Sequence, residues 1–263
     1  MDGLIDIGLN LMHKSFNKDR EDILSNANAV GVSQFIVTGS SVESSRAAIK
    51  YINESDLTGL YSTAGVHPHD AKTCDENTLD TLREFASEDC VVAIGECGLD
   101  YNRNYSPPDV QREWFEKQVA LALELDMPLF LHEREAHEDL VEILSKYPEM
   151  CSKAVVHCFT GTKEEAQDYI DLGCHIGVTG WICDERRGQS LQEAVSVIPP
   201  ERLMIETDAP FLIPRDFKKK PKSNKNKPEY LPHILEVIAS YKECSSEELA
   251  IDVSKTTRKF FNI

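Results

Sequence analysis

The sequence predicts a (β/α)8 barrel that spans residues 1–263 as a single domain, and three observations lead to this fold class. Short apolar runs rich in β-branched residues recur along the chain, eight in all. Stretches with apolar residues at three- and four-residue spacing, the pattern of amphipathic helices, lie between them. The 263 residues, of which 41% are hydrophobic, suffice for one large α/β unit, and no internal repeat or linker divides them.

The predicted strands follow one another in the chain order that a parallel barrel requires. They are residues 4–9, 33–38, 60–66, 91–96, 128–132, 154–157, 174–179 and 203–206. Prolines mark several of their ends: Pro128 opens the fifth strand, and the segments "GVHPHD" and "ETDAPFLIP" end the third and the eighth. Such breaks keep each strand short.

The clearest predicted helices lie at 112–126 and 138–147, where the apolar residues fall on one face. The last part of the chain, about 229–261, predicts two more helices. The second should begin at Ser245 or Ser246, because a serine followed by Glu248 matches a capping box, in which each side chain bonds the backbone N–H of the other residue.

The charge of the chain limits how it can bind nucleic acid. With 45 acidic and 28 basic residues the formal net charge is −17, which argues against passive electrostatic binding to a long polyanion. A substrate that carries phosphates must therefore be held locally. Residues 215–227, "RDFKKKPKSNKNK", gather six lysines; this lysine segment is either a solvated loop or such a local track.

The sequence predicts no membrane partner. The first residues are apolar only briefly and lack the basic flank of a signal peptide, and no later run approaches the roughly 18 apolar residues of a membrane span. The eight cysteines include no CxxC pair, so reduced thiols are expected. We therefore expect a soluble monomer in the cytoplasm, or in the nucleus if the source is a eukaryote.

Polar residues stand at the carboxyl ends of six predicted strand units. They are Asn10, His67, Glu96, His132, His157 and Asp208. In a parallel barrel these ends converge on one mouth, where the chemistry of such folds is found. Imidazoles and carboxylates are very costly to bury together without a cation, whereas a divalent metal makes each of them a ligand. The pattern therefore predicts a metal site that includes Glu96.

Strand alternation favours oxygen and nitrogen ligands at this site. If Glu96 and His157 point into the barrel, Cys97 and Cys158 point the other way. A thiolate site is then less expected than one made of carboxylates and imidazoles.

Six segments along the chain carry a resemblance: "GVHPHD", "AIGECGLDYNRN", "LHEREAH", "VVHCFTGT", "GWICDERRG" and "IETDAPFLIPRD". Together they resemble the TatD-related family of metal-dependent deoxyribonucleases, over a match that runs from Asp6 to Phe261. The resemblance implies a TIM barrel of the amidohydrolase kind, found in metal-dependent hydrolases. It also implies hydrolysis of phosphodiester bonds, typically with removal of nucleotides from the 3′ end of single-stranded DNA or RNA.

The resemblance also implies a set of metal ligands, all of them at predicted strand ends. Carried over by position, they are Glu96, His132, His157 and Asp208. The match departs at Gly8 and Asn10, where many members of the family carry two histidines. Glycine cannot ligate and an amide oxygen is a poor substitute for imidazole, so the sequence leaves open whether the centre holds one metal or two. The branch closest to TatD itself shares this departure.

The predicted chemistry needs a cation and a base. Mg²⁺ suits the mixed carboxylate and imidazole ligands, with Mn²⁺ or Zn²⁺ as alternatives. Asp208 is the predicted base that orients the attacking water, with Glu96 as the second catalytic carboxylate.

The substrate also needs positive charge and hydrogen-bond donors. Guanidinium groups offer the planar fork that phosphate prefers, and a histidine at the mouth can donate to a phosphate or leaving oxygen. The predicted substrate contacts are His67, Arg134, Arg186, Arg187, Lys218, Lys219 and Lys220. For Arg186 and Arg187 the alternative is surface ion pairing with Asp184 and Glu185.

Two other functions stay open at this point. The same fold hosts hydrolases that cleave carbon–nitrogen or ester bonds of a small molecule or an aminoacylated RNA. A nucleic-acid-binding relative that has lost catalysis is the other, motivated by Gly8 and Asn10.

Overall fold

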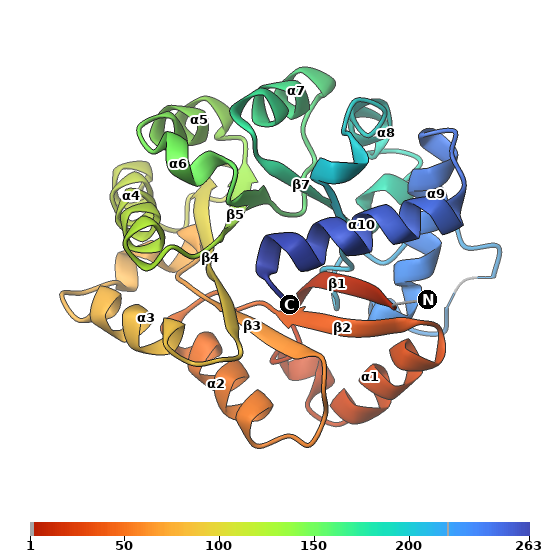
Figure 1. Cartoon of the computed structure of the whole chain (residues 1–263), viewed down its shortest axis with the longest axis horizontal. Helices are drawn as coiled ribbons and strands as arrows, with labels where there is room; N and C mark the ends of the chain where they lie inside the picture. The colour runs from red at the N-terminus through yellow and green to blue at the C-terminus, as the bar shows by residue number, and fades with distance from the viewer. Residues whose placement is uncertain (1–2, 220) are drawn as a thin grey trace.

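Eight parallel strands pair in chain order and form the barrel that the sequence predicts (Figure 1). The computed structural model describes residues 3–219 and 221–263. The strands are β1 (Leu4–Leu9), β2 (Val32–Val37), β3 (Leu60–Ala64), β4 (Val91–Asp100), β5 (Leu129–Arg134), β6 (Ala154–Val156), β7 (His175–Val178) and β8 (Leu203–Ile205). The eight predicted strands are confirmed, although β4 runs to Asp100 instead of ending at Glu96, because Gly98 and Asp100 still pair with β5.

The barrel closes between its first and last strands. Asp208 N–H donates to the Gly8 carbonyl at 2.8 Å, and Asn10 N–H donates to the Ala209 carbonyl at 2.9 Å. The Asp6 side chain in β1 accepts hydrogen bonds from the backbone N–H and the hydroxyl of Thr207. These bonds bring the segment after β8 against β1.

Helices surround the strands as an outer ring (Figure 1). The α-helices are α1 (Arg20–Ala29), α2 (Val42–Asn53), α3 (Thr78–Ala86), α4 (Pro108–Leu125), α5 (His137–Ser145), α6 (Pro148–Cys151), α7 (Lys163–Leu172), α8 (Gln189–Ala194), α9 (Leu231–Tyr241) and α10 (Ser246–Phe261). Short 3-10 helices are η1 (Lys14–Phe16), η2 (Pro68–Thr73), η3 (Gly180–Cys183), η4 (Pro200–Arg202) and η5 (Pro228–Tyr230). None of the described helices is long and apolar enough to cross a membrane.

The two predicted helices at the end of the chain are confirmed as α9 and α10, but the capping box is only half formed. The Ser245 hydroxyl accepts a hydrogen bond from Glu248 N–H at 3.3 Å, as an N-cap should. It donates to the Glu247 carboxylate at 2.8 Å, so the acidic partner is the neighbour of the predicted one.

The helix α10 covers the amino-terminal end of the barrel and crosses in front of the strands in Figure 1. Arg258 of α10 donates to the Gly3 carbonyl and to the Gln34 side chain, each at 3.1 Å. Phe261 joins the apolar cluster inside the barrel, where Phe130 and Met204 are fully buried. The interior of the barrel is thus packed, although a cavity of about 870 Å³ lies at this end, between α10 and the residues that precede β5, β6 and β8.

Candidate metal centre

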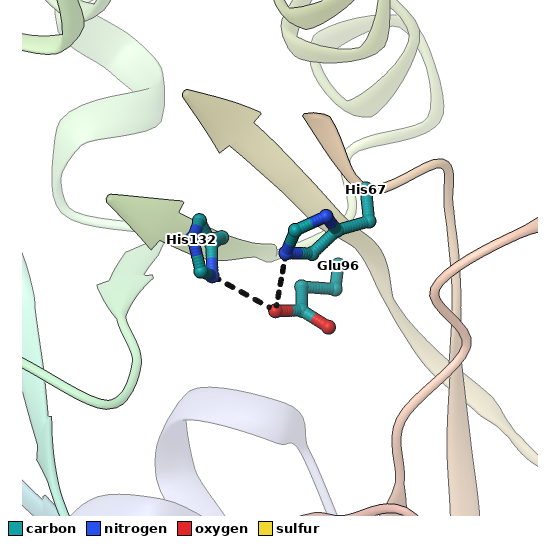
Figure 2. Close-up of side chains that lie close together, drawn as sticks. All are labelled: His67, Glu96 and His132. Carbon is teal, nitrogen blue, oxygen red and sulfur yellow. Dashed lines mark hydrogen bonds and ion pairs between the residues drawn. The ribbon is translucent and has the colours of Figure 1, made fainter. Parts of the chain in front are cut away.

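A single carboxylate, Glu96, lies at the centre of the candidate site. Its Oε1 atom is 2.8 Å from His157 Nε2, 3.2 Å from His132 Nδ1 and 3.4 Å from His67 Nε2. Figure 2 shows the rings of His67 and His132 both turned toward this oxygen. His67 follows β3, His132 lies in β5 and His157 directly follows β6. The barrel thus gathers four side chains that are far apart in the sequence.

The donor atoms suit a divalent cation. His67, Glu96 and His132 each offer one ligand atom, and these atoms lie within 4.8 Å of one another. Glu96 is only 7% exposed, and a carboxylate at such a depth among imidazoles is stabilised when a metal makes each of them a ligand. His67, Glu96 and His132 therefore form a possible metal site, with His157 against the same carboxylate.

A bulge in β4 directs Glu96 toward the mouth. Gly95 pairs with Phe130 of β5 and Cys97 pairs with Leu131, so Glu96 is an extra residue between the two pairs. The backbone of Gly95 has φ of 134°, and a Cβ there would lie 2.1 Å from the Phe130 carbonyl oxygen. Glycine is therefore required before Glu96, because the two strands approach too closely for any side chain.

Neighbouring charges set the protonation of the cluster. Burial alone would raise the pKa of Glu96, but His67, His157 and His132 hold this pKa well below its usual range. Burial would lower the pKa of His157, but the charges of Glu206 and Glu96 raise it well above its ordinary value. Glu96 is thus ionised, and the proton that His157 shares with the two carboxylates is one that a bound cation would displace.

His67 differs from the other histidines of the cluster. Burial lowers its pKa to about 3, although the Glu96 charge opposes this shift. Its Nδ1 atom accepts a hydrogen bond from His69 N–H at 3.0 Å. A neutral ring whose Nδ1 is an acceptor carries its proton on Nε2, the atom that faces Glu96; this nitrogen is a hydrogen-bond donor in that tautomer and a metal ligand in the other.

Asp208 stands on the far side of the mouth, after β8. Its backbone is left-handed, with φ of 52°, a conformation that aspartate adopts more readily than most residues. Asn10 Nδ2 donates to its Oδ1 atom at 2.8 Å and so holds the carboxyl group in place. Burial raises the pKa of Asp208 to about 7; His157 opposes this shift. A carboxyl group with such a pKa exchanges its proton near neutral pH.

Glu206, directly after β8, is fully buried and positions His157. Its Oε2 atom lies 3.2 Å from His157 Nδ1, and its Oε1 atom accepts a hydrogen bond from Cys158 N–H. His157 Nε2 is thereby left facing Glu96, the arrangement by which a carboxylate orients a metal-binding histidine. Gly8 makes room for this carboxylate, since a Cβ at position 8 would lie 2.0 Å from Glu206 Oε2.

Another buried carboxylate, Asp100, adjoins the cluster and was not among the predicted site residues. Its Oδ2 atom is 2.6 Å from His69 Nε2 and 3.3 Å from His132 Nε2. Burial would raise its pKa, but hydrogen bonds from His132 and from Arg103 N–H lower it below the usual range. No local pattern in the sequence marked Asp100, because the predicted strand ended at Glu96 and only the pairing with β5 extends β4 to Asp100.

The predicted phosphate contacts on arginine lie around Trp181 of η3. The guanidinium carbons of Arg134 and Arg187 are 5.6 Å and 4.4 Å from the centre of its ring. Arg187 Nη2 lies 2.9 Å from Asp184 Oδ2, and Arg186 Nε lies 3.7 Å from Asp184 Oδ1. These ion pairs are the ones expected if Arg186 and Arg187 pair with neighbouring acidic side chains on the surface instead of binding phosphate. Within residues 3–219 and 221–263, the Arg134 side chain forms no ion pair or hydrogen bond.

Some lysines of the lysine segment are exposed to solvent, and others are held by contacts with the barrel. Lys218 and Lys219 are exposed, whereas Lys220 lies outside the described residues. Lys225 is anchored, because its Nζ atom lies 2.7 Å from Asp19 Oδ2. The end of the segment is thus fastened to the loop after β1, and its exposed charge lies nearer its beginning.

The alternation argument holds for Cys97 but not for Cys158. Cys97 is fully buried in the core between strands and helices. Cys158 lies beyond the end of β6 in a left-handed conformation, with φ of 48°, so strand alternation does not extend to it. Burial raises the pKa of its thiol well above the ordinary value, and the charge of Asp208 adds to the shift. A thiol held neutral here agrees with a site of oxygen and nitrogen ligands.

Comparison with known proteins places this geometry in a wider context. The family model described as TatD related DNase matches residues 5–262. Two proteins named 3'-5' ssDNA/RNA exonuclease TatD, from Klebsiella pneumoniae and Pantoea ananatis, are 45% and 46% identical over 260 residues, covering 99% of this chain and 98% and 100% of theirs. The crystal structure of a TatD homologue from Escherichia coli K12 has a TM-score of 0.89 at 27% identity, covering 99% of this chain and 98% of that one.

Proposed function

The chain belongs to the TatD-related DNase family, and from this premise we propose that it is a metal-dependent exonuclease that removes nucleotides from the 3′ end of single-stranded DNA or RNA. Relatives that bear this activity in their name match nearly its whole length. The observation that carries the proposal is the Glu96 carboxylate, which has three imidazole nitrogens within 3.4 Å at the open mouth of the barrel.

Four side chains are proposed to hold the cation, with His67 beside them. They are Glu96, His132, His157 and Asp208. Mg²⁺ is the proposed ion, since mixed carboxylate and imidazole ligands with some waters retained suit a hard cation; Mn²⁺ or Zn²⁺ can take its place. When bound, the ion supplies positive charge that polarises the scissile phosphate and lowers the pKa of a nearby water.

The residues of the chain supply the remaining steps. Asp208, held by Asn10, accepts the proton of the attacking water. Arg134, whose guanidinium is otherwise unpaired among the described residues, contacts a phosphate oxygen. His67, with its proton on Nε2, donates a hydrogen bond to the phosphate or to the leaving oxygen. Glu206 takes no part in proton transfer and keeps His157 oriented.

We also infer that the protein works as a monomer in the cytoplasm. All eight cysteines lie within the described residues and are free thiols, the state that a reducing compartment maintains.

The test is cleavage of end-labelled single-stranded oligonucleotides by metal-stripped protein, with Mg²⁺, Mn²⁺ and Zn²⁺ restored separately. A 5′ label should remain on a ladder of shortening products, whereas a 3′ label should appear at once as a mononucleotide. Glu96→Ala and Asp208→Ala should abolish this cleavage while far-ultraviolet circular dichroism stays unchanged. Wild-type turnover by both variants at saturating metal would remove the basis of the proposed ligand set.

A further inference from the structure

A second group of metal-ligating side chains gathers outside the centre described above. Cys183 ends η3, Asp216 lies near the start of the lysine segment, and His233 lies in α9. Each offers one ligand atom, and the three atoms lie within 4.8 Å of one another. His233 Nε2 is 2.7 Å from Asp216 Oδ1. Three elements that are separated in the chain therefore converge on one point.

The surroundings of the three residues leave a ligand position open. Cys183 is only 3% exposed and forms the floor of the group, whereas Asp216 is exposed to solvent. The His233 ring lies 4.5 Å from the ring of Phe217, which restricts its orientation. A cation bound here would have three protein ligands, with water available on the exposed side.

The donor set selects a class of cation. Thiolate, imidazole and carboxylate are the ligands that zinc uses in proteins, and three of them with one water complete its tetrahedral coordination. Mg²⁺ and Ca²⁺ prefer oxygen ligands alone, so a sulfur atom in the group disfavours them. The group also differs in kind from the proposed catalytic centre, which has only oxygen and nitrogen ligands and shares no residue with it.

We propose that Cys183, Asp216 and His233 form a second metal site, for a thiophilic divalent cation such as Zn²⁺, which fastens the start of the lysine segment to η3 and α9. This site does not depend on the proposed nuclease activity. Burial raises the pKa of the Cys183 thiol, and the charge of Asp216 adds to the shift, so the cation displaces a proton when it binds. Affinity should accordingly increase with pH.

The first experiment uses Co²⁺ as a spectroscopic substitute for Zn²⁺, added to metal-stripped full-length protein in excess Mg²⁺. A thiolate that binds Co²⁺ produces a near-ultraviolet charge-transfer band, which oxygen and nitrogen ligands do not produce. The band should reach its limit at one equivalent of bound Co²⁺ and disappear on addition of Zn²⁺. It should be lost in Cys183→Ser and retained in Cys158→Ser, the variant that removes the thiol directly after His157.

His233→Ala provides a second test in case Cys183→Ser fails to fold, because His233 is only partly buried. His233→Ala should lower the affinity for Co²⁺ by more than the roughly 10- to 100-fold that loss of an outer-shell partner costs. Trypsin offers a second readout: Zn²⁺ should slow cleavage after Lys218 and Lys219 in the wild type but not in His233→Ala. Absence of the band in the wild type, a band that survives Cys183→Ser, or unchanged affinity in His233→Ala would each overturn the proposal, whatever the nuclease assay shows.

Discussion

The substitution Gly8→Ala tests whether β1 serves the centre by leaving space for a carboxylate. An ideal Cβ at position 8 would lie 2.0 Å from Glu206 Oε2, and Cβ atoms essentially never come within 3.0 Å of a heavy atom beyond their own residue and its two chain neighbours. The oxygen must therefore retreat by about 1 Å. Its hydrogen bond to His157 Nδ1 is already 3.2 Å long, so a displacement of this size is expected to weaken or break it.

Two effects of different size are expected. The carboxylate is the end of a flexible side chain, so overpacking should lower the free energy of unfolding by only about 1–3 kcal/mol. Loss of the group that orients His157 should weaken metal affinity or turnover by roughly 10- to 100-fold. The functional loss should thus appear under conditions in which the variant is still folded.

The assay combines metal titration, cleavage of a labelled oligonucleotide and denaturant unfolding in a double-mutant cycle with Glu206→Asp. Shortening Glu206 by one methylene draws back the carboxylate oxygen that the new methyl group would meet. Gly8→Ala should therefore cost much less in the Glu206→Asp background than in the wild type. Equal losses in both backgrounds, or wild-type metal affinity in Gly8→Ala, would refute the reasoning.

Two further predictions concern the lysine segment and a buried acid. Changing three exposed lysines of the segment to glutamine should reduce the slope of log binding constant against log salt concentration by about 2, at about 0.7 per phosphate contact. Cleavage of a dinucleotide should stay unchanged. An equal effect from a control set of three lysines elsewhere would contradict the role of the segment as a local track for nucleic acid. The segment set is Lys218, Lys219 and Lys222, and the control set is Lys50, Lys117 and Lys255, one each on α2, α4 and α10. Burial raises the pKa of Asp6 from 3.8 to about 7, so its contribution to stability is complete below about pH 4 and is lost as the pH rises through about 7. Urea unfolding of metal-free protein at about pH 5 and about pH 8 should show a larger fall in stability for the wild type than for Asp6→Asn, and parallel curves would contradict this.

The strands could be predicted because a parallel strand inside a barrel is buried on both faces and forms a continuous apolar run. The largest error lies at the end of β4, where "GECGLD" mixes glycine and polar residues and no apolar pattern continues. Pairing of Gly98 with His132 and of Asp100 with Arg134 extends the strand there. That pairing depends on β5, about thirty residues further along the chain, and so is absent from any local pattern.

The positions of the central side chains followed from the strand ends, whereas their partners did not. The ion pairs of Arg187 could be considered in advance because Asp184 is close in sequence. The partner of Lys225 is Asp19, 206 residues earlier, and only the closed barrel brings the two together. A lysine-rich composition therefore indicated a basic segment but not which of its charges are free.

The residues at and just after the first strand help to distinguish an active enzyme from a relative that has lost catalysis. The hypothesis that catalysis has been lost rested on Gly8 and Asn10, which stand where many members of the family carry histidines. Both positions have a defined use in this barrel: Asn10 holds Asp208 through a 2.8 Å hydrogen bond, and Gly8 admits the Glu206 carboxylate that orients His157. A chain that had lost its chemistry would have no reason to keep a buried carboxylate in contact with this histidine, since such a group is costly unless the site it supports is in use. The departure at β1 is therefore better explained as a change from binding a metal to positioning the residues that are proposed to bind it.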